Sequence, residues 1–149
     1  MTKEERCLKA ASCHASSLNC AQSVLCAFSD MIGLDENQCC ALGSSFGGGL
    51  RYGGVCGTVS AAAIILGILY PHTPENGMEG KQRSISLILD FEKRFTGVFP
   101  SLDCRDLKDR TDLIGTPVTG VLGITGTCDR IIVSAVELLV DMLDELKRE

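Results

Sequence analysis

The chain has 149 residues, of which 45% are hydrophobic and 22% charged, a balance that indicates a folded protein and excludes a disordered one. We expect a single domain over residues 1–149, with a mobile stretch at residues 1–15. The net charge of −5, without a basic stripe, disfavours nucleic acid as a partner, because duplex binding relies on clustered cations.

Helical periodicity predicts an all-α bundle of five to six helices. Asp35 and Gln38 have the spacing of a capping box at the start of one helix, and a glycine-rich loop over 44–55 precedes a buried central helix. We interpret the segment 115–126 as a loop or a short strand. The predicted helices cover residues 17–32, 35–43, 57–70, 81–95, 105–108 and 129–149.

No segment has the pattern of a membrane span or a signal peptide. The first residues carry charges and no apolar core. The longest apolar run, 59–70, is shorter than the ~20 residues that cross a bilayer. We therefore expect a cytoplasmic protein without membrane insertion.

Cysteine is the residue type that points to function. A cytoplasmic protein keeps its thiols reduced, which favours metal or redox chemistry over a disulfide scaffold. No two cysteines have the C-x-x-C spacing, which excludes the thioredoxin motif, the zinc ribbon and attached c-type haem. The nine cysteines are Cys7, Cys13, Cys20, Cys26, Cys39, Cys40, Cys56, Cys104 and Cys128.

Four of these cysteines lie at predicted helix starts: Cys20, Cys56, Cys104 and Cys128. A helix N-terminus has unpaired N–H groups and a partial positive charge, which favour the thiolate. We therefore expect these four residues to converge on one site, as redox thiols or as metal ligands.

The other five cysteines have a simpler interpretation. We expect Cys26, Cys39 and Cys40 to be small buried apolar residues, since free cysteine is often buried. Cys7 and Cys13 lie in the polar stretch that we expect to be mobile, although the pair Cys13-His14 has the residue types of a metal site.

The glycine-rich loop allows two interpretations. It lacks the Lys-Ser/Thr of a P-loop and the spacing of a dinucleotide fingerprint. It is either a plain surface loop or a place where the backbone approaches another helix or a bound group near Cys56. The candidate cofactor-contacting residues are Gly47, Gly48, Gly49, Gly53, Gly54 and Gly57.

Four segments of the chain carry a resemblance to a known family: NCAQSVLCAF (19–28), FGGGLRYGGVCGTVSAAAIILGILY (46–70), LDCRDL (102–107) and TCDRIIVSAVELL (127–139). Together they resemble the C_GCAxxG_C_C family of redox-active proteins, which has four signature cysteines. By position the signature cysteines are Cys20, Cys56, Cys104 and Cys128. This chain has Thr58 and Ala61 where the family motif has alanine and glycine. The chain is also similar to the non-haem part of split-Soret cytochromes, a resemblance that implies an iron–sulfur centre and a homodimer.

Three functions are consistent with these residues. The first is an iron–sulfur cluster on the four cysteines, used in electron transfer with an unidentified redox partner protein. The second is thiol–disulfide exchange without metal, in which Cys56 attacks and another signature cysteine resolves. The third is a structural Cys₄ zinc site. The protein is then an oxidoreductase, an electron carrier or an interaction module.

Overall fold

The computed structural model describes all 149 residues, and it contains helices but no strand. The all-α class is confirmed. The predicted number of five to six helices is wrong, because there are nine α-helices and one short irregular turn, η1. The elements are α1 (Lys3–Ala15), α2 (Cys20–Ala27), α3 (Ser29–Ile32), α4 (Glu36–Gly43), η1 (Gly49–Gly53), α5 (Gly57–Leu69), α6 (Gly77–Thr96), α7 (Cys104–Leu107), α8 (Pro117–Val121) and α9 (Thr127–Lys147).

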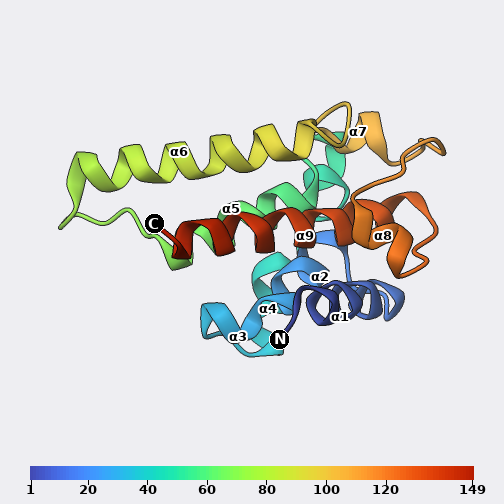
Figure 1. Cartoon of the computed structure of the whole chain (residues 1–149), viewed down its shortest axis with the longest axis horizontal. Coiled ribbons are helices and arrows are strands. Elements are labelled where there is room, and N and C mark those ends of the chain that lie inside the picture. The colour runs from blue at the N-terminus through green and yellow to red at the C-terminus, as the bar shows by residue number, and fades with distance from the viewer.

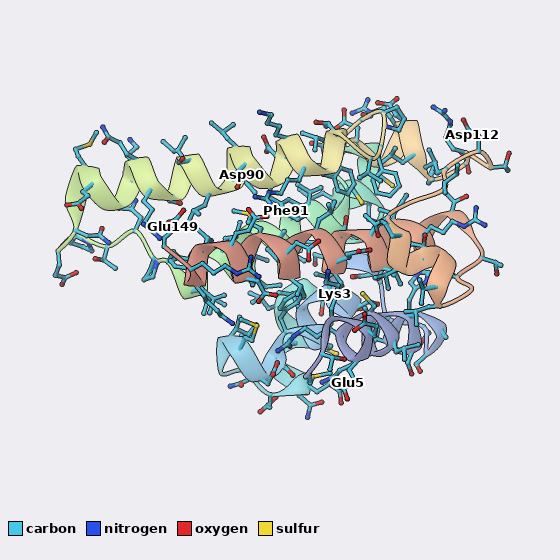
Figure 2. All side chains as sticks on the ribbon, in the orientation of Figure 1. Lys3, Glu5, Asp90, Phe91, Asp112 and Glu149 are labelled. Carbon is cyan, nitrogen blue, oxygen red and sulfur yellow. The ribbon has the colours of Figure 1, made fainter.

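The C-terminal helix α9 is the centre of the arrangement. Figure 1 shows α9 crossing the middle of the molecule, with α6 on one side and α1 on the other. It contacts α1, α2, α5, α6 and α8, and α2 in turn contacts α1, α4 and α5. One core of 32 buried apolar residues runs between these helices. Phe91 is fully buried and points from α6 toward α9 (Figure 2).

The N-terminal residues are helical, where the sequence led us to expect a mobile stretch at residues 1–15. Thr2 and Glu5 form a capping box at the start of α1. The Arg6 guanidinium is buried and donates to both carboxylate oxygens of Asp30, at 2.6 and 2.9 Å, and to the Ala27 carbonyl. The polar sequence of this segment therefore forms a helix, and the buried face of that helix includes an arginine.

Two further differences account for the helix count. The predicted helix at 17–32 is interrupted at Phe28, which ends α2 and precedes α3. The segment 115–126 contains the short helix α8 instead of being only a loop or a short strand. The buried Glu137 carboxylate on α9 accepts a hydrogen bond from the Val118 backbone N–H at 3.0 Å and so holds the first turn of α8.

No helix of the fold combines the length and the apolar character that a membrane span requires.

Candidate functional site

Four cysteines from four separate segments line one pocket of about 250 Å³. Cys20 and Cys104 are the first residues of α2 and α7, Cys56 immediately precedes α5, and Cys128 is the second residue of α9. The predicted placement of these residues at helix starts is confirmed. Cys56 is 6% exposed, Cys20 and Cys104 are half-buried, and Cys128 is exposed, so the pocket is closed at Cys56 and open at Cys128.

Backbone pairing holds Cys56 beside Cys104. Val55 and Asp103 form an isolated antiparallel bridge. On its two sides the Cys56 N–H donates to the Leu102 carbonyl at 2.8 Å, and the Cys104 N–H donates to the Gly54 carbonyl at 2.7 Å. Two residues that are 48 positions apart in the sequence are thereby fixed at the same wall of the pocket.

The start of α2 is fixed by its capping residue. Asn19 and Gln22 form a capping box, and the Asn19 amide also donates to the carbonyls of Gly43 and Ser44 at 3.1 and 3.2 Å. These bonds join the first turn of α2 to the end of α4. Cys20, the next residue, is therefore held in place at the pocket wall.

The close approach of α5 to Cys20 requires glycine at position 57. A Cβ atom on Gly57 would clash with the Cys20 sulfur and would also lie 2.9 Å from the Phe46 carbonyl oxygen. Because Gly57 has no side chain, its N–H group reaches the Cys20 sulfur as a hydrogen-bond donor. Gly57 therefore permits both the close approach of α5 to Cys20 and the hydrogen bond to the Cys20 sulfur.

The glycine-rich loop forms a left-handed turn beside the pocket. Gly48, Gly49, Leu50 and Arg51 are consecutive residues with φ between 56° and 64°. For a non-glycine residue this conformation costs about 1–2 kcal/mol. Such strain persists where the surrounding structure enforces it, which is common at functional sites. The plain surface loop is therefore the less suitable interpretation.

The six candidate glycines divide into two groups. Gly47 and Gly48 line the pocket, and Gly57 contacts Cys20. The remaining three, Gly49, Gly53 and Gly54, do not line the pocket but shape the turn.

Hydrogen bonds favour a thiolate on Cys20. The Cys56 thiol and the backbone N–H groups of Ala21, Gly48 and Gly57 donate to its sulfur and lower the pKa of Cys20 to about 6, although burial opposes the shift. The same hydrogen bond, together with burial, raises the pKa of Cys56 well above its ordinary value. The thiol–disulfide hypothesis named Cys56 as the attacking group; the structure favours Cys20 instead.

The charge on Cys20 also affects the remaining two cysteines. Burial, followed by the negative charge of Cys20, raises the pKa of both Cys104 and Cys128. Arg51 and Lys108 line the pocket and lower the pKa of Cys104 in opposition. The site therefore favours one thiolate among thiols, with two cations available to offset further negative charge.

In their present positions the four sulfurs do not surround a single tetrahedral ion. No three of them lie within 4.8 Å of one another. Thiolates that share one zinc ion at about 2.3 Å are about 3.8 Å apart. The pocket between them has room for a larger group.

Sequence reasoning assigned no role at the pocket to Thr58 or Lys108. Thr58 donates to or accepts from the Cys56 sulfur at 3.2 Å, and Arg51 and Lys108 supply positive charge. His14 lines the pocket and pairs with Asp129 at 2.7 Å, so it does not form a common site with its neighbour Cys13. The only sequence signal for Thr58 and Lys108 is that each lies a few positions after a signature cysteine.

Replacing Gly57 with alanine tests the close approach to Cys20. We expect Gly57→Ala to lower the free energy of unfolding by about 1–3 kcal/mol, because the new methyl group overpacks the contact. Gly67→Ala on the same helix is the matched control, since nothing lies within 4 Å of its Cβ position and alanine favours the helix. Urea unfolding measures both. Equal stability of the two variants would contradict the close contact.

Alkylation across pH tests the thiolate at Cys20. In reduced, metal-free protein, we expect the iodoacetamide labelling rate of Cys20 to rise with pH around a midpoint of about 6, because only the thiolate reacts. Cys104 and Cys128, whose pKa values are raised, should reach half their maximal rates only at a much higher pH than Cys20. Peptide mass spectrometry measures each residue. Faster labelling of Cys104 or Cys128 than of Cys20 near pH 7 would contradict this assignment.

Comparison with known proteins identifies the family. No match was found among curated proteins or among solved structures. A family model described as "Putative redox-active protein (C_GCAxxG_C_C)" matches residues 18–142, a range that includes all four pocket cysteines. The resemblance seen in the sequence is therefore confirmed, and the chain belongs to the C_GCAxxG_C_C family.

Proposed function

We propose that Cys20, Cys56, Cys104 and Cys128 bind an iron–sulfur cluster and that the protein is an electron carrier. The observation that carries this proposal is the convergence of four cysteines on one pocket of about 250 Å³. Four thiolates are the usual ligand set of [2Fe–2S] and [4Fe–4S] clusters. The family description as redox-active agrees with this chemistry.

The spacing of the sulfurs favours a cluster over a single zinc ion. Thiolates that bind different irons of a polynuclear cluster stand further apart than thiolates that share one ion. The absence of any three signature sulfurs within 4.8 Å supports the first arrangement. The structural zinc hypothesis would require side chains to move until all four sulfurs surround a common centre.

Backbone donors and nearby cations suit a negatively charged cluster. The N–H groups of Ala21, Gly48 and Gly57 donate to the Cys20 sulfur. Such hydrogen bonds to ligand sulfur stabilise the reduced, more negative state and raise the reduction potential. Arg51 and Lys108 at the pocket wall act in the same direction.

The four ligands differ in burial, so the site has a closed side and an open side. A bound cluster would accept and donate single electrons. Cys56 would hold it on the closed side, and the exposed Cys128 would bring it within reach of a redox partner. The resemblance also implies a homodimer, which stays a prediction.

Thiol–disulfide exchange is the second candidate, because Cys20 has the hydrogen bonds of a thiolate. The Cys20 thiolate would attack one sulfur of a partner's disulfide, and the partner's other sulfur would leave as a thiolate. Cys56, after losing its proton, would attack Cys20 in the mixed disulfide. The products would be a Cys20–Cys56 disulfide and a partner reduced by two electrons.

Replacing a signature cysteine separates the two candidates. We expect anaerobically purified protein to show the visible charge-transfer absorption of an iron–sulfur cluster, and Cys56→Ser to lose it or retain only a small fraction. Cys7→Ser is the matched control, since Cys7 is a buried thiol outside the pocket. An absorption spectrum that is identical in the wild-type, Cys56→Ser and Cys7→Ser proteins would contradict the cluster proposal.

A further inference from the structure

A second group of thiols lies at the junction of α1, α2 and α4, outside the pocket. Cys13, Cys26 and Glu36 bring two sulfur atoms and a carboxylate oxygen within 4.8 Å of one another. The Cys40 sulfur lies 3.8 Å from the Cys26 sulfur. We call these four residues the junction cluster. None of them lines the pocket of the signature cysteines.

Three ligand atoms of the junction cluster, from Cys13, Cys26 and Glu36, have the spacing of ligands to one ion, and Cys40 is close to one of them, Cys26. In a tetrahedral zinc site with Zn–S bonds of about 2.3 Å, two sulfurs are about 3.8 Å apart. The Cys26 and Cys40 sulfurs have this separation. The sulfur of Cys13 and the Glu36 oxygen are within the 4.8 Å limit of Cys26, so small side-chain rotations bring them to bonding distance.

The backbone around the junction cluster is already fixed. The Gln22 side-chain amide on α2 donates to the Cys40 carbonyl at 3.0 Å and so joins α2 to α4. Asp35 and Gln38 form a capping box that sets the first turn of α4, where Glu36 is located. The ligands thus stand on helices whose mutual positions do not depend on a metal, as a preorganised site requires.

Burial and charge also suit a cation. Cys13 and Cys26 are buried, Cys40 is half-buried and Glu36 is exposed, so an ion can enter from the side of Glu36. Three thiolates and one carboxylate leave a bound divalent ion with a net charge of about −2 by simple addition. Lys9 on α1 provides positive charge near Cys13 and so reduces this excess.

We propose that Cys13, Cys26, Cys40 and Glu36 form a second metal site, which binds a soft divalent cation such as Zn²⁺. On binding, the three thiols release their protons to solvent and each sulfur forms one bond to the ion, with no change in oxidation state. This site does not depend on the function proposed for the signature cysteines. Its position near the end of α2, about 9 Å along the helix from Cys20, leaves the two sites separate.

Cobalt titration tests the proposal in a chain whose first site is disabled. In the Cys56→Ser background, we expect metal-free, reduced protein to bind one Co²⁺ per chain, with thiolate-to-cobalt charge transfer and the visible bands of tetrahedral cobalt. Zn²⁺ should displace it, with proton release. Adding Cys26→Ser should abolish these bands, whereas adding Cys7→Ser, which removes a buried thiol from α1, should leave them unchanged.

A second variant covers the case in which Cys26→Ser does not fold, as judged by circular dichroism. Glu36 is exposed, so Glu36→Gln in the same background should fold and weaken Co²⁺ binding about 10-fold or more. Two results would overturn the proposal. One is the absence of thiolate-bound Co²⁺ in Cys56→Ser protein. The other is an unchanged affinity for Co²⁺ in the Cys26→Ser variant or, if that variant does not fold, in the Glu36→Gln variant. Neither result bears on the cluster proposed for the signature cysteines.

Discussion

The contact between the first residue of α5 and the Cys20 sulfur is the constraint on which the site depends. Gly57 lets the two helices approach until a backbone N–H meets sulfur, and any Cβ atom there would prevent it. With α2 and α5 fixed in this way, the bridge between Val55 and Asp103 adds Cys104 to the same wall. The central helix α9 then adds Cys128 on the open side of the pocket.

Helix α2 contributes a cysteine to a different group of sulfurs at each of its ends. Its first residue, Cys20, faces the pocket, and Cys26 near its end belongs to the junction cluster. The two groups differ in spacing: no three of the pocket sulfurs lie within 4.8 Å of one another, whereas the ligand atoms of Cys13, Cys26 and Glu36 at the junction do.

Local sequence signals predicted the helices and the placement of the signature cysteines. The capping box of Asp35 and Gln38 formed as expected. The periodic segment 81–95 lies within α6, and the predicted helix 129–149 corresponds to α9, which ends at Lys147. The helix α1 escaped prediction because its buried face includes Arg6, whose charge is neutralised by a residue on α3. Composition alone could not reveal that partner.

Contacts between distant segments set the limits of the sequence analysis. The left-handed turn at Leu50 and Arg51 is imposed by its surroundings, since neither residue favours that conformation. Cys26, Cys39 and Cys40 were expected to be buried apolar residues; Cys26 and Cys39 are buried, whereas Cys40 is only half-buried. That interpretation missed the meeting of Cys26 with Cys13 and Cys40, because no spacing in the sequence relates residues on three different helices.

The iron and acid-labile sulfide content of anaerobically purified protein tests the central claim most directly. The account predicts iron and sulfide in matching amounts, two or four of each per chain, with a brown colour that bleaches on reduction. Protein that contains neither iron nor sulfide after anaerobic purification, and that does not take up a cluster from iron and sulfide under reducing conditions, would contradict it.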